Sequence, residues 1–181
     1  MAPESDSDAE GRREEAVSAL VKHLMHVCIT VPNLDQALNF YRDVLGFESV
    51  FETRNDKADG RLLGFGTDEV SISAHHVLTV GADAQTATAI NLVEHTQPET
   101  VVNGGPYDQM NHVGITRLAL LVDNVDEAFA RIRSHDGVTI VCPPRGIVIQ
   151  DPKVPVTSRW FSFTDPFGVF VTMTEPLPDQ C

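Results

Sequence analysis

The chain has 181 residues, of which 42% are hydrophobic and 22% charged, and its formal net charge is −13. This composition is ordinary for a soluble globular protein with one domain or two small modules. The acidic charge argues against nucleic acid and anionic membrane as partners, because both require a basic surface. No apolar run could span a bilayer, and the N-terminus does not resemble a signal peptide. Three widely spaced cysteines favour reduced thiols, so we expect a cytoplasmic protein.

Two segments precede the first clear strand. Residues 1–13 are largely polar, with four acidic residues and two arginines, which predicts a disordered acidic leader. Residues 14–24 place Ala16, Leu20 and Leu24 on one side and predict a short amphipathic helix.

A strand and a helix are predicted next. Apolar and polar residues alternate over residues 26–31, so His26 and Cys28 share the polar face of the strand. Asn33 is a favourable N-cap, and the apolar spacing after it is that of a helix. Gly46 can end this helix in the left-handed conformation.

The same strand–helix pattern recurs 91 residues later, with Val122 in the place of Val31. At this offset the two helix caps, Asn33 and Asn124, coincide, and so do the core positions of the two helices. Agreement in spacing, caps and register predicts an internal duplication. Two unrelated strand–helix segments with a common turn are the weaker alternative.

The remaining patterns complete two modules of the order β-α-β-β-β. In the first module the further strands are predicted at 47–53, 70–80 and 88–93, with a polar turn at 54–60, an ambiguous segment at 61–67 and a turn at 81–85. The second module is predicted to have a strand at 117–122, a helix at 125–134, strands at 138–142, 160–163 and 169–174, a candidate strand at 146–150, a loop at 152–155 and a β-turn at 165–168.

These elements predict an α+β fold in which two βαβββ modules form a cupped mixed sheet with helices on its convex side. The expected divisions of the chain are 1–13 for the leader, 14–96 for the first module and its preceding helix, 97–115 for the inter-module loop, 116–176 for the second module and 177–181 for the tail.

Four segments resemble the vicinal oxygen chelate superfamily, which includes lactoylglutathione lyase, methylmalonyl-CoA epimerase, extradiol dioxygenases and bleomycin-resistance binding proteins. The segments are residues 26–47, 90–94, 118–133 and 163–175. The likeness extends over about residues 24–176 and implies the cupped fold. It is weak for the reaction, because members of this superfamily catalyse many reactions and some only bind ligands.

In metal-binding members the resemblance implies a ligand on each of four strands, most often two histidines and two carboxylates. The corresponding positions here hold His26, Asn91, Arg117 and Thr172. Arginine cannot coordinate a cation. At about 4 Å from a divalent ion its charge would cost roughly 8 kcal/mol at an effective dielectric constant of about 20. We therefore expect no metal and no cofactor.

Ligands from outside those four positions are an open alternative, although nothing in their spacing distinguishes them. The candidates are His75, His76, Glu94, His112 and Glu175. His75 and His76 are consecutive in a predicted strand, so at most one of them can face the cup.

His26 and Arg117 are the expected catalytic residues. A histidine facing the cup can act as a general acid or base, or it can be a structural residue that is hydrogen-bonded to its neighbours. Arg117 lies in apolar sequence, and a buried guanidinium needs an anion. A bound carboxylate, phosphate or enolate would supply one, but so would an internal salt bridge, for example to Glu94. Both alternatives remain open for both residues.

The expected ligand-binding residues are Cys28, Asn91, Arg117, Thr172 and Trp160. Asn91 and Thr172 can orient a polar ligand or simply serve strand hydrogen bonds. Cys28 is expected to be a small buried side chain, because no base adjoins it in sequence. Trp160 can form the wall of a pocket for an aromatic ligand, although core packing is the default for such residues.

Three functions fit these features. The first is a metal-independent isomerase, cyclase or lyase acting on a small oxygenated molecule; the second is a protein that binds a hydrophobic metabolite or antibiotic without turnover. The third is a metal-dependent lyase or dioxygenase with atypical ligands. We also expect a homodimer, because sheets of this kind leave edges and apolar faces that can pair two chains.

Overall fold

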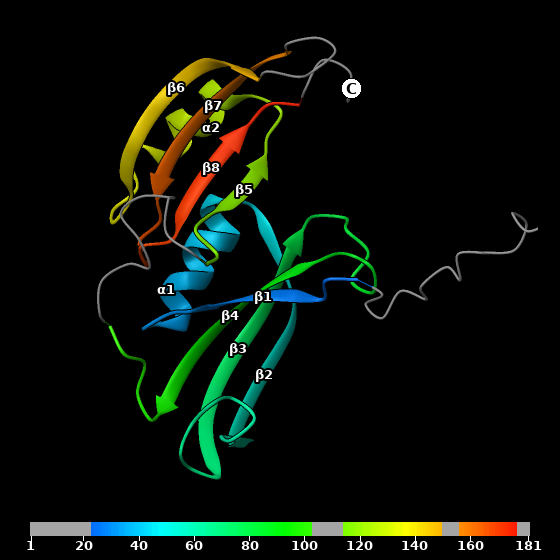
Figure 1. Ribbon diagram of the computed structural model, residues 1–181, viewed down its shortest axis with the longest axis vertical. Coiled ribbons are helices and arrows are strands. Elements are labelled where there is room, and N and C mark those ends of the chain that lie inside the picture. Colours follow the sequence, from blue (N-terminus) through cyan, green and yellow to red (C-terminus); the bar gives the residue numbers. More distant parts are fainter. Residues whose placement is uncertain (1–22, 103–113, 150–155, 177–181) are drawn as a thin grey trace, which may run out of the picture.

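The computed structural model describes residues 23–102, 114–149 and 156–176 (Figure 1). It confirms the α+β class with two β-α-β-β-β modules. The elements of the first module are β1 (His26–Thr30), α1 (Leu34–Leu38), η1 (Asn39–Val44), β2 (Phe47–Asp59), β3 (Glu69–Thr79) and β4 (Ala89–Gln97). Those of the second are β5 (Leu118–Leu121), α2 (Val125–Ile132), β6 (Thr139–Ile149), β7 (Val156–Thr164) and β8 (Phe170–Thr174).

Each module has its own four-stranded mixed sheet. The strand orders are β1-β4-β3-β2 and β5-β8-β7-β6, so the second sheet repeats the topology of the first. In both sheets the first strand runs parallel to the last, and the other pairs are antiparallel. Within the described ranges no strand of one sheet is hydrogen-bonded to a strand of the other, so β1 and β5 are edge strands.

The two helices begin at the asparagine caps that the repeat predicts. The side chain of Asn33 accepts a hydrogen bond from the backbone N–H of Gln36, and that of Asn124 accepts from Asp126 and Glu127. After Leu38 the first helix continues as the π-helical segment η1. The whole helical stretch therefore matches the single helix expected between the cap Asn33 and Gly46, and Gly46 follows it with φ of +84°.

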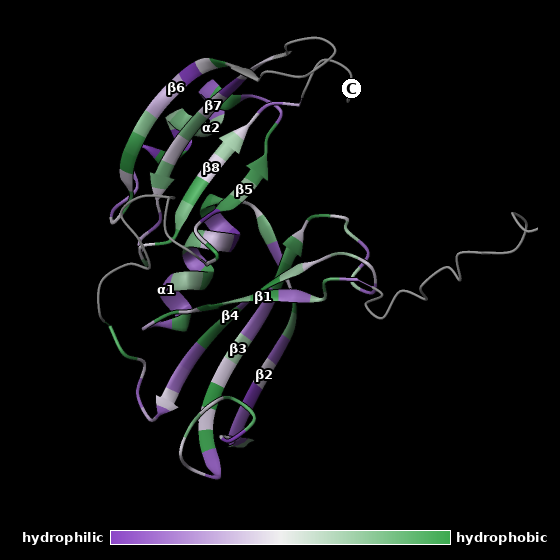
Figure 2. Ribbon diagram, viewed as in Figure 1, coloured by the Kyte–Doolittle hydropathy of each residue, from purple (hydrophilic) through white to green (hydrophobic). Residues whose placement is uncertain are grey.

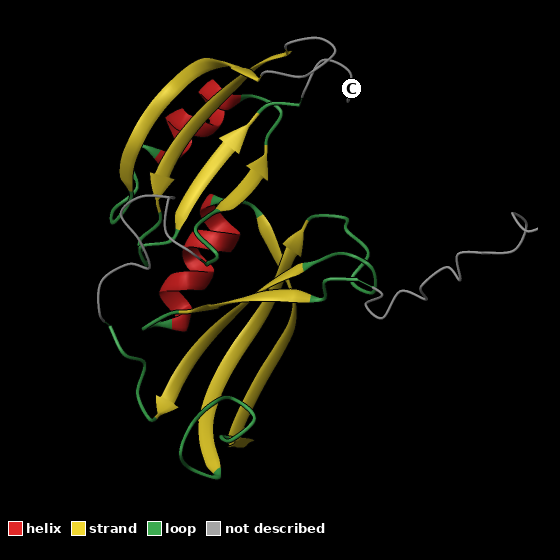
Figure 3. Cartoon of the chain, viewed as in Figure 1, coloured by secondary structure: helices red, strands yellow, loops and turns green. Residues whose placement is uncertain are grey.

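One hydrophobic core joins the two modules. The buried side chains of α1 and η1 pack with the inner faces of β1, β3 and β4, and the same cluster includes Val125, Phe161 and Phe163 from the second module. The red helical stretch formed by α1 and η1 lies between the two sheets in the view of Figure 3. Polar and apolar residues alternate over residues 69–74 of β3, which Figure 2 shows as a change of colour from residue to residue. One face of each sheet thus packs on a helix.

Two predictions about the strands are wrong. The polar segment 54–60, expected to be a turn, mostly continues β2 to Asp59 with a register shift between Asn55 and Ala58. Residues 139–149 form one strand, β6, in place of two separate pieces. In both cases the residues pair with a long neighbouring strand, and this pairing keeps them extended although their strand propensity is low.

Several predicted segments lie outside the described residues: the leader at 1–13, most of the helix at 14–24, the central part of the inter-module loop, the loop at 152–155 and the tail. His23 and Leu24, the described end of the predicted helix, are not helical. Among the helices of the described residues, none has the length and apolarity needed to cross a membrane.

Candidate functional site

The helix-free face of the first sheet gathers polar side chains. Ile29 packs toward the helix, so His26 and Cys28, one position out of phase, lie on the opposite face. Strand register places Asn91 beside Cys28 and His76 beside Asn91. We call this surface the first polar face; its members are His26, Cys28, Phe51, His76 and Asn91.

His26 and His76 form an edge-to-face ring pair on the first polar face. Their ring centroids lie 5.1 Å apart at an interplanar angle of 70°, and the ring of Phe51 packs on His76 at 5.6 Å. Nδ1 of each histidine is buried and has no hydrogen-bond partner among the described residues. Burial, and then the charge on His26, lower the pKa of His76 from its ordinary value. This arrangement favours a neutral His76 that is available for proton transfer.

Alternation in β3 decides which of the two consecutive histidines reaches this face. Val77 is buried in the core, so His75 also lies on the helix side, and its Nδ1 is 2.9 Å from the hydroxyl oxygen of Ser49. Of the two consecutive histidines, His76 is therefore the one that lies on the first polar face, a choice that the sequence left open. The parity of Val77 in the core was the signal that could have identified it.

Asn91 and Cys28 are in contact on the same face. The amide nitrogen of Asn91 donates to Sγ of Cys28 at 3.6 Å, while its Oδ1 is buried without a partner in the described part of the chain. Cys28 is exposed, which contradicts the expectation of a small buried side chain. The reason is that β1 is an edge strand, so one flank of Cys28 has no neighbouring strand.

The helix-free face of the second sheet carries the other predicted residues. Phe161 and Met173 pack on the helix side, so Trp160 and Thr172 lie on the opposite face. The guanidinium carbon of Arg117 lies 5.5 Å from the centroid of the Trp160 ring, a cation–π arrangement. Trp160 Nε1 and Thr172 Oγ1 are buried and have no partner among the described residues. We call this surface the second polar face; its members are Arg117, Trp160 and Thr172.

Arg117 is exposed, which contradicts the expectation of a buried guanidinium. Glu94, considered above as its salt-bridge partner, lies on the helix side of the first sheet. There its Oε2 accepts the backbone N–H of Leu34 at 2.8 Å. Arg117 precedes an edge strand, and stacking on Trp160 holds it in place without using its N–H donors.

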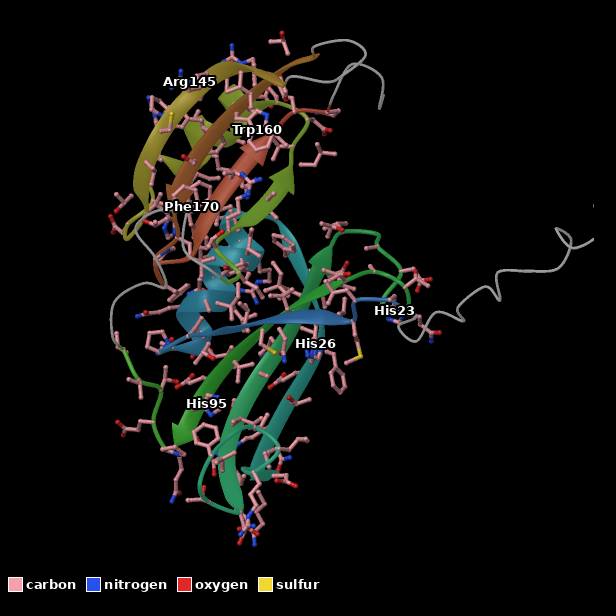
Figure 4. All side chains as sticks on the ribbon, viewed as in Figure 1. His23, His26, His95, Arg145, Trp160 and Phe170 are labelled. Atoms are coloured by element: carbon pink, nitrogen blue, oxygen red, sulfur yellow. The ribbon has the colours of Figure 1, made fainter. Side chains whose placement is uncertain are left out.

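A groove of about 400 Å³ lies between the start of the second module and β1. Cys28 from the first polar face and Arg117 from the second both line it. His26, Asn91, Thr172 and Trp160 do not line it. The rest of the lining is largely apolar: Val27, Ile29, Thr30, Pro32, Thr100, Val101, Val102, Ile115, Thr116, Leu118, Phe167, Val169 and Phe170. Figure 4 shows His26 on β1, apart from Trp160 on β7.

The donor set does not fit a catalytic metal. The four positions that correspond to ligands hold an imidazole, an amide, a guanidinium and a hydroxyl, and a guanidinium repels a cation. The described residues also bring together no group of three or more His, Cys, Asp or Glu side chains that could hold a metal ion. Glu94 and Glu175, the carboxylates that could have supplied ligands, each accept a backbone N–H at a helix start.

Comparisons with known proteins agree with this architecture. A 2-epi-5-epi-valiolone epimerase from Actinomyces sp. is 28% identical over 145 residues, which cover 80% of this chain and 74% of the epimerase. A glyoxalase family protein from Bacillus cereus has a TM-score of 0.67 at 20% identity, covering 88% of this chain and 97% of that one.

An antibiotic-binding protein from a Streptomyces species superposes with a TM-score of 0.52 at 20% identity, covering 88% of this chain and 99% of that one. The family model described as Glyoxalase/Bleomycin resistance protein/Dioxygenase superfamily matches residues 23–173. With the duplicated βαβββ module and its two polar faces, this match shows that the chain belongs to the glyoxalase/bleomycin resistance protein/dioxygenase superfamily.

Proposed function

We propose that the protein is a cytoplasmic, metal-independent enzyme that isomerises, or cleaves by a lyase reaction, a small oxygenated molecule. The observation that carries this proposal is the His26–His76 pair, whose rings lie 5.1 Å apart and whose buried Nδ1 atoms have no partner among the described residues. An imidazole placed in this way can act as a general base and then as a general acid. The relative named as an epimerase supports this class of reaction.

The proposed mechanism uses both polar faces, brought together between two copies of the chain, so that His26 of one copy and Arg117 of the other contact the same substrate. His26 removes a proton from the carbon next to a carbonyl group, and the electron pair moves onto the carbonyl oxygen as an enolate. Arg117 binds this oxyanion, because a guanidinium presents several N–H donors in one plane and stacking on Trp160 leaves them available. Return of the proton to carbon completes an isomerisation, while loss of a neighbouring group from the enolate gives a lyase reaction.

We further propose a homodimer, in which the second polar face of one copy lies across from the first polar face of the other. Both faces belong to separate sheets that end in the edge strands β1 and β5. Large apolar side chains are exposed on or near these strands, including Leu121 at 65% and Ile115 at 74%. Unpaired edges with exposed apolar residues favour association with another chain.

Binding without turnover is the second candidate function. The groove favours it, because its lining includes Val101, Val102, Ile115 and Phe170 and has the apolar character of a small-molecule pocket. A sequestering protein would use Arg117 to orient its ligand and would not need His26.

Isotope exchange separates the candidates. The protein is incubated in D₂O with carbonyl compounds that have an enolisable carbon, including 2-epi-5-epi-valiolone, and deuterium uptake and epimer formation are followed by NMR. We expect exchange that persists in the presence of a chelator. His26→Ala should lower turnover more than binding. Arg117→Ala should weaken binding by about 1.5–3 kcal/mol, the range for hydrogen bonds to a charged group.

Arg54→Ala is the matched control, because Arg54 is an exposed arginine of β2 and should affect neither measurement. Saturable binding with no deuterium uptake would favour sequestration. Stoichiometric metal bound at His26, or undiminished exchange in His26→Ala, would refute the mechanism.

A further inference from the structure

Arg145 shares the second polar face with Arg117. In β6 and β7, Cys142 pairs with Ser162 and Arg145 pairs with Trp160, so three steps along β6 correspond to two along β7. The extra residue lies at Pro143–Pro144 and forms a β-bulge. A second register shift precedes it, between Ile140 and Cys142, and after both shifts Arg145 pairs with Trp160 on the face opposite to Ile140, which packs on the core. Figure 4 labels Arg145 on β6 near Trp160 on β7.

The two arginines approach the same tryptophan from opposite edges of the sheet. In the order β5-β8-β7-β6, Arg117 directly precedes one edge strand and Arg145 lies on the other. Arg117 stacks over the Trp160 ring at 5.5 Å, and Arg145 is its directly paired neighbour in the adjacent strand. Paired residues of antiparallel strands have Cβ atoms about 5 Å apart, so both guanidinium groups can reach one ligand above Trp160.

This face has positive charge without a matching carboxylate. In the part of the chain that the structure describes, no ion pair uses Arg117 or Arg145. Arg159, on the other side of β7, pairs with Asp126 at 2.6 Å. The strand positions in register around Trp160 carry hydroxyl groups: Ser158, Ser162, Thr164, Thr172 and Thr174. Among the described residues, the two arginines therefore have no carboxylate partner.

Two further donors on this face have no protein partner in the described ranges. Thr172 is only 5% exposed, and its Oγ1 has no hydrogen-bond partner among the described residues. Nε1 of Trp160 is also buried without a hydrogen-bond partner among the described residues. Buried polar atoms are nearly always satisfied by protein, water or ligand, and a hydroxyl and an indole N–H beside two guanidinium groups suit an oxygen-rich anion.

We propose that Arg145 and Arg117 form a two-guanidinium site, on either side of Trp160, for the phosphate monoester of a polyhydroxy carbonyl compound. Arg117 has five N–H donors, so it can bind a phosphate oxygen as well as the enolate oxygen of the proposed function. The inference deepens the proposed function, on which it rests, by naming the substrate class. A single carboxylate is satisfied by one guanidinium fork, whereas a phosphate monoester near neutral pH has close to two charges and three acceptor oxygens. The surrounding hydroxyl groups and the indole N–H suit the hydroxyl-bearing carbon chain of the ligand.

The site contains its own probe, because Trp160 is the one tryptophan of the chain. Its emission is followed during titration with inorganic phosphate, sorbitol 6-phosphate, gluconate and sorbitol. We expect sorbitol 6-phosphate to bind more tightly than gluconate or sorbitol. Arg145→Gln should weaken its binding by about ten- to hundredfold, as for a lost hydrogen bond to a charged group, with a smaller effect on gluconate.

Arg159→Gln is the matched control, since it removes an arginine from the helix side of the same strand as Trp160 and should leave the phosphate titration unchanged. Arg145→Lys, which keeps the charge but not the planar fork, should bind with intermediate affinity, and circular dichroism verifies that the variants are folded. Equal affinity of wild type and Arg145→Gln for sorbitol 6-phosphate would overturn the proposal, as would gluconate binding as tightly as the phosphate ester.

The two experiments distinguish failure of the proposed phosphate site from failure of the proposed isomerase. Phosphate-dependent quenching that requires Arg145, without deuterium exchange on any carbonyl compound, would support this site and reject the isomerase. Exchange on unphosphorylated substrates, with no effect of Arg145→Gln, would reject this site and support the isomerase.

Discussion

The hydroxyl group of Tyr41 donates a 2.9 Å hydrogen bond to Oδ2 of Asp165, and this bond joins the helix of the first module to the turn before β8 of the second. Both side chains are almost fully buried, at 1% and 2% exposed. The other carboxylate oxygen of Asp165 accepts the backbone N–H groups of Phe167 and Val169. Tyr41 therefore anchors a turn of the second module to the shared core.

Replacement of Tyr41 by phenylalanine should destabilise the protein while keeping the shape of the core. The change leaves a buried carboxylate oxygen without its donor, so we expect the free energy of unfolding to fall by about 1.5–3 kcal/mol. Urea unfolding followed by circular dichroism measures the change. Tyr41→Phe in the Asp165→Asn background is the control, and there the effect should be smaller. A change below about 0.5 kcal/mol in the wild-type background would contradict this account.

Asp165→Asn should alter how stability depends on pH. Burial raises the pKa of Asp165 above its ordinary value of 3.8, although hydrogen bonds from Val169, Tyr41, Phe167 and Gly168 oppose the shift. Between the ordinary and the raised pKa, the folded protein holds this proton more firmly than the unfolded chain does. The contribution of Asp165 to stability therefore falls as pH rises through that window.

Urea unfolding of wild type and Asp165→Asn, compared at several pH values from about 3 to 7, tests this expectation. The wild type should lose stability relative to the variant as pH increases above 3.8. A stability difference that is independent of pH, or that grows in favour of the wild type, would show that the carboxyl group has no raised pKa.

His76 should titrate below the ordinary histidine pKa of 6.5, because burial and the nearby charge of His26 both disfavour its protonated form. NMR titration of the imidazole nitrogens measures this value directly. In His26→Gln the pKa of His76 should rise, although not to 6.5, because burial remains. The contribution of His76 to stability is lost as pH falls through the window below 6.5. An unchanged pKa in the variant would argue against electrostatic coupling of the pair.

Association of two chains should depend on the edge of the second sheet. Leu121 is 65% exposed on the edge strand β5, and a glutamate there would oppose an apolar contact. Light scattering should return about twice 19.8 kDa for wild type and a monomer for Leu121→Glu. Val50→Glu, at an exposed position of β2, is the control and should remain dimeric. A monomeric wild type at micromolar concentration would reject the dimer.

The duplication was the most informative feature of the sequence. Because helix caps and apolar spacing depend on local contacts, the sequence alone suffices to place Asn33 and Asn124 at helix starts, and both form the expected caps. The same local alternation placed His26 and Cys28 on one face of the first strand, while Asn91 was named through the family resemblance. The fold class followed from the order of these elements.

Features that depend on strand order could not be predicted in this way. Cys28 and Arg117 are exposed because β1 and β5 are sheet edges, and alternation within a strand says nothing about its neighbours. The pairing of Arg145 with Trp160 follows two register shifts in β6, one between Ile140 and Cys142 and one between Cys142 and Arg145, and alternation alone does not predict such shifts. His76 was not singled out, because its ring packs against that of His26, which lies 50 residues away in the chain.

The two helix-capping glutamates have a consequence for how this protein can change. Glu94 accepts the first helical N–H of α1 at 2.8 Å, and Glu175 accepts that of α2 at 3.0 Å, so both copies of the module keep the same helix-side framework. At equivalent positions of the opposite faces the copies share little: His26 stands where the other has Arg117, and Asn91 where it has Thr172. In each sheet the residues that stabilise the fold and the residues proposed to bind ligand thus lie on opposite faces, which leaves each polar face free to acquire new specificity at little cost to the scaffold.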